Sequence, residues 1–118
     1  LNVYLLKRVC DYLEIDHNIK ILSELHLTHE EVKASDEWGL YVTKQLGGQS
    51  YINLPSGKSF YNRDKYANHH IHLQFIENNI GEYNQKKEGF ESSLSIIDVM
   101  MFNHVKEIRK MLDDYQLT

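Results

Sequence analysis

The sequence predicts a small α/β fold in which a parallel sheet is connected by crossover helices and followed by a C-terminal helical pair. Three short apolar runs with strand character, at residues 19–22, 50–53 and 71–76, alternate with segments of helical periodicity. Strands joined through helices are normally parallel with right-handed crossovers. The apolar segment 94–103 then has the signals of a helix. We therefore expect at least three parallel strands in two or three layers, within a single domain covering residues 1–118.

The bulk composition limits the class of protein. The length of 118 residues fits one domain, and 42% apolar residues are ordinary for a globular chain. A net charge of −4 without a lysine-rich block disfavours nucleic-acid binding. No run approaches 18 apolar residues, so we expect no membrane span. The single cysteine, Cys10, cannot form an internal disulfide and fits a reducing compartment.

The first half of the chain contains two expected helices and one expected strand. Residues 1–14 carry apolar side chains at spacings of three and four, which predicts an amphipathic helix. Residues 19–22 read as a short strand. Ser35 or Asp36 can cap a second helix that runs through Leu46, and the two glycines that follow suit its end.

The middle of the chain predicts a strand, a short helix and a second strand. Residues 50–53 form a strand, and the turn signal at 55–57 ends it. Asn62 is placed to cap a helix over 63–68. Alternation of apolar and polar residues then predicts the strand at 71–76. The polar residues 77–93 read as a long loop.

Ser95 and Asp98 carry the start signal of the helix in 94–103. The Ser95 hydroxyl can accept from the backbone N–H of Asp98, while the Asp98 carboxylate reaches back to the N–H of Ser95. Because nearly all other residues of this segment are apolar, we expect the helix to be buried on most sides. The alternative is that Asp98 is a buried functional carboxylate. We favour the capping role because it explains the residue without any catalytic function.

A break at Asn103 and a second helix from His104 complete the expected helical pair. Asn103 tolerates a positive φ and is a good cap. The apolar residues Val105, Ile108, Leu112 and Tyr115 share one face at helical spacing.

The segment Ser56-Gly57-Lys58-Ser59 resembles the end of a phosphate-binding P-loop but lacks its first glycine, which Ile52 replaces. Two interpretations remain open. Gly57 can take a positive φ in a simple turn, or the segment can be a ligand loop at the C-terminal end of a strand. In the second case, Tyr51 and Asn53 flank the same crevice.

Histidines are the only residues that suggest a metal site. Only His70 and His72 would share a face of a strand, and neither His69 nor the pair His26 and His29 supplies an identifiable third ligand. We therefore expect solvated histidines and no metal. The eight tyrosines suit pockets and interfaces, although half-buried core edges are the more common explanation. No nucleophile–histidine or paired-carboxylate arrangement can be argued from the spacing.

The sequence resembles the WbqC-like family over roughly residues 40–117. The resemblance rests on the following segments: Tyr51-Ile52-Asn53, Gly57-Lys58, Tyr61, Leu73-Gln74-Phe75, Tyr83-Asn84-Gln85, Phe90 and Leu94 through Asn103. The last block is the most specific, with Met100 where leucine is usual. Members are about twice this length, and their N-terminal motifs Gln-Pro-x-Tyr-x-Pro and Asp-Asp-x-Gln-Phe are absent here. The chain thus looks like the C-terminal part of a longer protein.

The resemblance implies a bacterial, cytoplasmic protein of surface-polysaccharide (O-antigen or capsule) biosynthesis. It suggests a transferase that modifies a nucleotide-linked amino sugar by group transfer, with catalytic residues outside these 118 residues. A nucleotide sugar or another small molecule is the expected ligand, and no cofactor is identified. The expected substrate-binding residues are Tyr51, Asn53, Ser56, Gly57 and Tyr61 at the strand end, and Tyr83 and Gln85 in the long loop.

Two other classes of function stay open. The chain can be a non-catalytic binding or homo-oligomerisation module whose tyrosines serve an interface. It can also be a fragment without independent activity.

Overall fold

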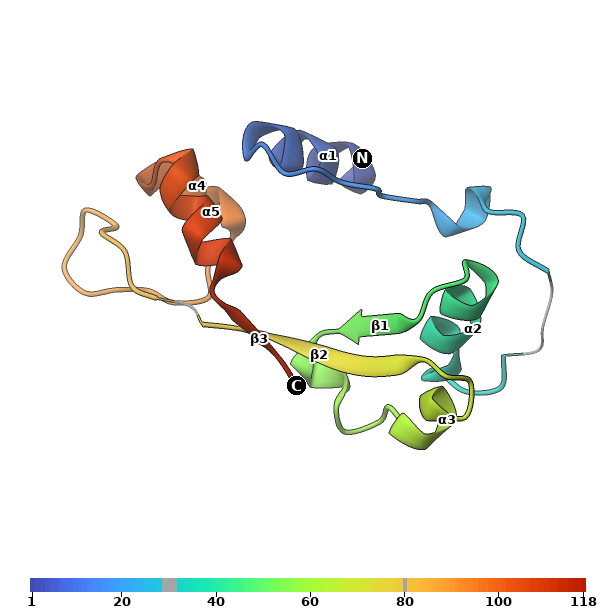
Figure 1. Ribbon diagram of the computed structural model, residues 1–118. Coiled ribbons are helices and arrows are strands. Elements are labelled where there is room, and N and C mark those ends of the chain that lie inside the picture. Colours follow the sequence, from blue (N-terminus) through green and yellow to red (C-terminus); the bar gives the residue numbers. More distant parts are fainter. Residues whose placement is uncertain (29–31, 80) are drawn as a thin grey trace. The chain divides into compact units, whose positions relative to one another are not determined.

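The computed structural model describes residues 1–28, 32–79 and 81–118 and shows a mixed α/β chain (Figure 1). These residues form five α-helices and one three-stranded sheet. The chain divides into two compact units. We call residues 1–20 and 78–115 the helical unit, and residues 21–77 and 116–118 the sheet unit.

The sheet has the strand order β1-β2-β3, with β1 at Ser50–Asn53, β2 at His72–Asn78 and β3 at Tyr115–Leu117. β1 and β2 are parallel, with Tyr51 opposite Leu73 and Asn53 opposite Phe75. Phe75 and Thr118 exchange two backbone hydrogen bonds of 2.9 and 3.0 Å, which is the pattern of an antiparallel pair. The sheet is therefore mixed, and only its β1–β2 part matches the expected parallel sheet.

Two expected elements are wrong. Residues 19–22 are not a strand: the chain there leads into a 3₁₀ turn, η1, at Leu22–Glu24. Three apolar residues in a run of four do not by themselves make a strand, because a strand also needs a partner for its backbone groups. The helix expected to include Tyr115 ends at Asp113, and β3 begins two residues later. The structure does not confirm a three-layer arrangement.

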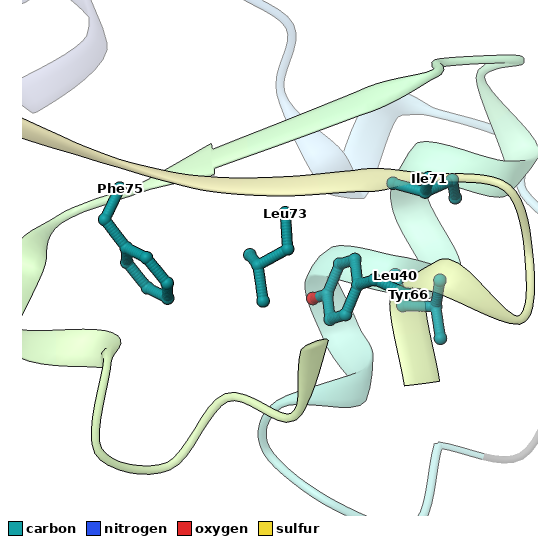
Figure 2. Close-up of a cluster of buried hydrophobic side chains, with 5 residues drawn as sticks. All are labelled: Leu40, Tyr66, Ile71, Leu73 and Phe75. Carbon is teal, nitrogen blue, oxygen red and sulfur yellow. The ribbon is translucent and has the colours of Figure 1, made fainter. Parts of the chain in front are cut away.

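The core of the sheet unit lies against one face of β2. Ile71, Leu73 and Phe75 alternate with polar residues and are each at most 5% exposed. They cluster with Leu40 and Tyr66, which come from the two helices of this unit (Figure 2). At about 25 cal/mol per Å² of buried apolar surface, such side chains supply most of the driving force for folding.

The predicted helix starts of the sheet unit are confirmed in position. Helix α2 spans Glu37–Gln45, directly after Asp36, and Gly47 has φ +68° past its end. Helix α3 spans Arg63–Ala67, and the Asn62 side chain accepts from the N–H groups of Asp64 and Lys65 at 2.9 and 3.4 Å. Between β1 and α3 lies a 3₁₀ turn, η2, at Pro55–Gly57.

The helical unit contains α1 at Asn2–Tyr12 and the predicted C-terminal pair, α4 at Ile96–Phe102 and α5 at Val105–Asp113. Leu13 and Ile108 are its fully buried side chains among the described residues. Asn103 separates the pair as predicted, but with an extended φ of −129° rather than a positive one. His104 then caps α5, and the Glu107 carboxylate accepts from the His104 N–H at 3.1 Å.

Helix α4 is not buried on most sides, contrary to expectation. Ile97 is 61% and Met101 73% exposed, and no residue of α4 is fully buried. Helix α1 likewise exposes Leu5 and Leu6 by about half. The described part of the chain therefore leaves apolar helix surface uncovered.

Candidate functional site

The seven predicted binding residues fall into two groups, one in each unit. The sheet unit holds Tyr51, Asn53, Ser56, Gly57 and Tyr61, and the helical unit holds Tyr83 and Gln85.

Tyr51 and Tyr61 belong to an aromatic cluster beside the core. The Tyr51 ring stacks on the Tyr61 and Tyr66 rings with centroids 5.9 and 5.6 Å apart, and Tyr61 meets Phe75 edge-on at 6.2 Å. The two hydroxyls of Tyr51 and Tyr61 are 3.4 Å apart. Burial, followed by the contact with Tyr61, raises the pKa of Tyr51 to about 12. Both rings therefore serve packing, and Tyr51 remains a neutral hydroxyl at physiological pH.

Gly39 makes room for this cluster, and sequence reasoning missed it. A Cβ at Gly39 would lie 2.4 Å from Cζ and 2.6 Å from Cε1 of Tyr51. The ring of Tyr51 thus rests directly on the backbone of α2. The available signal was a glycine inside a helix, which commonly marks a close packing contact.

Gly57 is required by close packing and not by a positive φ, which corrects the simple-turn interpretation. Only Gly47 and Gly89 among the described glycines have positive φ. A Cβ at Gly57 would lie 3.0 Å from Nδ2 of Asn53 and 3.1 Å from Cδ2 of Tyr61. The turn therefore brings three predicted residues together at the C-terminal end of β1.

Three backbone N–H groups of the turn are already bonded within it. The N–H groups of Gly57 and Lys58 donate to the carbonyls of Leu54 and Pro55 at 3.0 Å. The Asn53 Oδ1 accepts from the Leu54 N–H at 2.8 Å. These three N–H groups are therefore not available to a ligand. Ser56 is exposed, so its hydroxyl is open to solvent.

Two cations lie beside the same end of the parallel pair, and the prediction did not include them. Lys58 forms an ion pair with Glu77, which holds the pKa of that carboxyl below its usual value. The Lys58 ammonium lies 5.9 Å and the Arg63 guanidinium 5.4 Å from the centroid of Phe75. Arg63 also donates to the Leu73 carbonyl at 2.9 Å, which fixes its position.

In the helical unit, Asp98 binds Tyr83 and Gln85 instead of capping α4. The Tyr83 hydroxyl donates to Asp98 Oδ2 at 2.5 Å, and Gln85 Nε2 donates to the same oxygen at 3.0 Å. Ser95 occupies the N-cap, and its hydroxyl accepts from the Ile97 N–H at 3.2 Å. The hydrogen bond to the Asp98 carboxylate raises the pKa of Tyr83.

Gln85 closes the loop around Tyr83. Its amide donates to the Glu91 carbonyl and accepts from the Glu91 N–H, both at 2.9 Å. The side chain is 7% exposed, so these bonds satisfy a buried polar group. The Tyr83 ring meets Phe90 edge-on at 5.1 Å. Gln85 Nε2 also donates to the Tyr83 hydroxyl at 3.5 Å, so Gln85 is a brace for the loop and for Tyr83.

A small cavity of about 240 Å³ adjoins Tyr83 within the helical unit. Most of its described lining is apolar and includes Phe90, Leu94, Val99, Ile108 and Met111. The volume is slightly below the usual range of ligand cavities, about 300–1,000 Å³. The cavity can take an apolar group, with the Tyr83 hydroxyl as one polar contact.

The histidines do not form a metal centre in the described ranges. Residues 1–28, 32–79 and 81–118 contain no group of three or more His, Cys, Asp or Glu side chains that is placed to hold an ion. His72 lies on β2, while His70 has φ +58° in the preceding turn. His29 lies outside the described residues. Cys10 is unpaired and partly exposed.

No helix in the described ranges combines the length and the apolar character that a bilayer crossing requires.

Comparison with known proteins gives one match. No curated protein and no solved structure matches the chain. The family model of the WbqC-like proteins matches residues 1–110, so it also covers α1 and the segment before α2. The chain therefore belongs to the WbqC-like protein family.

Proposed function

We propose that this chain supports the synthesis of bacterial surface polysaccharides, O-antigen or capsule, in the cytoplasm. Its role is to bind a nucleotide-linked amino sugar that undergoes group transfer, with the catalytic residues outside these 118 residues. Membership of the WbqC-like family supports the pathway. The observation that carries the binding role is the group of polar side chains at the C-terminal end of the β1–β2 pair.

That end of a parallel pair is where open α/β sheets bind ligands. The turn after β1 presents the Asn53 amide and the exposed Ser56 hydroxyl, and Lys58 and Arg63 lie beside it. Amide and hydroxyl groups suit sugar hydroxyls, and the two cations suit phosphate oxygens. Gly57 and the rings of Tyr51 and Tyr61 set the shape of the turn. In the helical unit, Tyr83 is the second proposed contact, and Gln85 holds its loop in place.

A titration followed by backbone amide NMR tests the binding role. UDP- and dTDP-linked amino sugars are added to the labelled chain, with the same sugars lacking the nucleotide and its phosphates as the comparison. We expect shifts at residues 53–59 for the nucleotide sugars. Lys58→Gln should weaken binding about tenfold, since a hydrogen bond to a charged group contributes about 1.5–3 kcal/mol. Lys20→Gln, an exposed lysine in the helical unit, is the matched control.

The outcome that contradicts the proposal is an absence of shifts at both residue groups, 53–61 and 83–85, at millimolar nucleotide sugar. Equal weakening by Lys58→Gln and Lys20→Gln would also count against it, because that result indicates only nonspecific charge attraction.

A non-catalytic interaction module is the second candidate, and the exposed apolar helix surfaces favour it. Ile97 and Met101 on α4 are more than 60% exposed, which is unusual for large apolar side chains next to each other on one helix. Light scattering over a range of concentrations tests self-association. A particle mass that stays that of a monomer removes the homo-oligomer version, and a mass that rises with concentration and falls for Met101→Glu supports it.

A further inference from the structure

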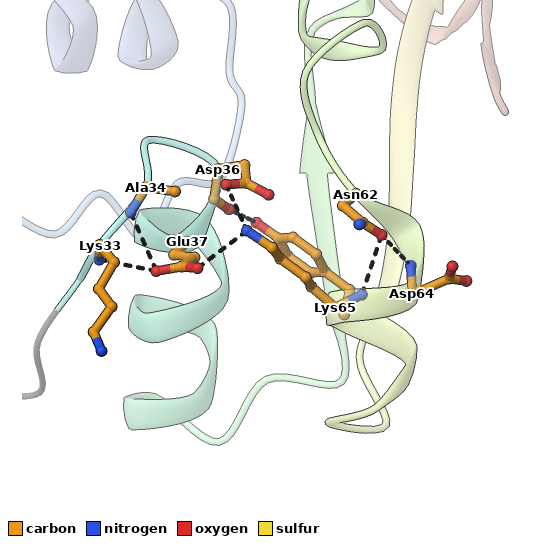
Figure 3. A network of polar contacts seen from close by, with 8 residues as sticks. Lys33, Ala34, Asp36, Glu37, Asn62, Asp64 and Lys65 are labelled. Carbon is orange, nitrogen blue, oxygen red and sulfur yellow. Dashed lines mark hydrogen bonds and ion pairs between the residues drawn. The ribbon is translucent and has the colours of Figure 1, made fainter.

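Two cavities of similar volume differ in the charge of their linings. One, of about 310 Å³ in the sheet unit, is lined by residues of α2 and α3 that include Glu37 and Lys65. Its charged groups bind one another: Lys65 Nζ donates to Glu37 Oε1 at 3.0 Å and to Asp36 Oδ1 at 3.1 Å (Figure 3). The other is the cavity of about 240 Å³ beside Tyr83 in the helical unit, which we call the Tyr83 cavity.

The Tyr83 cavity has a neutral lining. None of the lining residues that the structure describes is Asp, Glu, Lys, Arg or His, and the polar ones are Asn78, Asn79, Ser93 and Tyr83 itself. Asp98 binds the Tyr83 hydroxyl but is not among the lining residues. An ion that enters such a site loses its hydration and meets no opposite charge, which is costly. The lining therefore favours a neutral ligand.

Apolar side chains from three segments make up most of the lining. Val99 comes from α4, Ile108 and Met111 come from α5, and Phe90 comes from the loop between β2 and α4. Ile108 is fully buried and the other three are partly buried. Side chains that face an empty space lack contacting atoms on one side, and an apolar ligand supplies those contacts.

Polar contacts hold the loop in place beside both helices. Near the start of the loop, the Asn79 N–H donates to the Asp114 carbonyl at 2.9 Å, and the Asn79 side-chain amide donates to the Asp114 carboxylate at 2.8 Å. Further along, Tyr83 and Gln85 both donate to the Asp98 carboxylate on α4. These bonds fix the loop to α4 and to the residue after α5. The position of the loop therefore does not depend on what fills the cavity.

The rim and the volume of the cavity indicate the size of the ligand. Leu94, Ile96 and Leu112 also line the cavity and remain 49%, 38% and 40% exposed, so apolar surface surrounds its opening. An apolar cavity of about 150 Å³ is large enough to bind benzene. A volume of about 240 Å³ accordingly has room for such a ring with a short substituent.

We propose that the Tyr83 cavity binds a small neutral molecule that is mostly hydrocarbon, about the size of a substituted benzene ring. The ligand packs against Phe90, Val99, Ile108 and Met111 and covers the apolar rim. This site does not depend on the nucleotide-sugar binding proposed at the end of β1. Either proposal can fail while the other stands, because the two are read out at different residues.

Methyl NMR on the whole chain, with three probes built on one ring, tests the proposal. Toluene is neutral, whereas benzoate and benzylammonium carry a negative and a positive charge. We expect saturable shifts of the Val99, Ile108 and Met111 methyl groups with toluene. Both ions should bind at least about tenfold more weakly, because the lining offers them no opposite charge. The methyl groups of Leu5 and Leu6, which are exposed on α1 and do not line the cavity, should show no saturable shift.

Two substitutions on α4 separate binding in the cavity from adsorption to exposed apolar surface. Val99→Phe adds carbon atoms to a lining side chain and should weaken toluene binding about tenfold or more. Because it fills empty space, it should not lower the midpoint of thermal unfolding. Ile97→Phe is the matched control, since Ile97 is 61% exposed on the same helix and does not line the cavity, and it should leave binding unchanged.

Leu112→Trp is a second filling variant at the partly exposed rim, and it replaces Val99→Phe if that chain does not fold. The proposal is overturned if toluene gives no saturable shift at the three lining methyl groups, or if either ion binds as tightly as toluene. It is also overturned if a filling variant that folds weakens toluene binding no more than Ile97→Phe does.

Discussion

Because Gly39 contacts the Tyr51 ring, we expect Gly39→Ala to lower the free energy of unfolding of the wild-type chain but to raise that of a Tyr51→Val variant. Replacing an interior helix glycine by alanine ordinarily stabilises a protein by about 1 kcal/mol. Here the added Cβ would lie within 2.8 Å of three atoms of the Tyr51 ring. That ring is itself confined by stacking on Tyr61 and Tyr66, so it cannot move away freely.

The expected change in the free energy of unfolding is the balance of the steric cost and the gain in helix propensity. Overpacking of a well-filled site costs about 1–3 kcal/mol. Subtracting the helix gain, Gly39→Ala should lower the free energy of unfolding by about 0–2 kcal/mol. In a Tyr51→Val background the ring is gone and strand propensity is kept, so the same change should raise the free energy of unfolding by up to about 1 kcal/mol. The coupling energy of the pair is then about 1–3 kcal/mol.

Urea unfolding followed by tryptophan fluorescence measures this double-mutant cycle. Trp38 is the single tryptophan of the chain and lies on α2, next to Gly39, so its signal reports on the sheet unit. If Gly39→Ala stabilises the wild-type background as much as it stabilises Tyr51→Val, Tyr51 does not pack on the α2 backbone and the reasoning fails.

Three further predictions concern the polar network, a helix cap and pH. Tyr83→Phe should destabilise the helical unit, because it removes a hydrogen bond to the Asp98 carboxylate, and faster amide exchange over residues 83–98 would show this. Asn62→Ala should cost about 1 kcal/mol of unfolding free energy in urea through loss of the α3 cap, and an unchanged midpoint would contradict the capping geometry. Stability of the sheet unit should fall between about pH 10 and pH 12: the folded pKa of Tyr51 lies at about 12 and that of Tyr66 is also raised, so the unfolded tyrosines lose their protons first. The free energy of unfolding should fall by at most about 1.4 kcal/mol per pH unit for each tyrosine, and by less for the partly exposed Tyr51. A free energy of unfolding that does not change up to pH 12 would refute this prediction.

Elements specified by local signals could be predicted from the sequence. The Asn62 cap, the periodicity of residues 1–14 and the alternation around Leu73 each depend on neighbours a few residues away, and the structure contains the corresponding helices and strand. The break at Asn103 is of the same kind.

Features that depend on distant partners could not be predicted. Tyr115 continues the helical spacing of Ile108 and Leu112, but the backbone that follows it pairs with β2, some forty residues earlier. Asp98 has the position of a capping residue, yet Tyr83, fifteen residues away, binds its carboxylate. The exposure of α4 could not be predicted either, because the apolar residues of one segment do not indicate whether another segment packs against them.

The third strand of the sheet has a consequence for the order of folding. β1 and β2 are about twenty residues apart, and the local helix α3 connects them, whereas the Phe75–Thr118 contact closes a loop of 43 residues. The entropy lost on loop closure grows with loop length, and distant contacts form late. The β1–β2 pair with its aromatic cluster can therefore assemble first, and β3 adds to it last. Kinetic probes on Trp38 and on the Thr118 amide should accordingly report separate phases, with the edge strand the slower of the two.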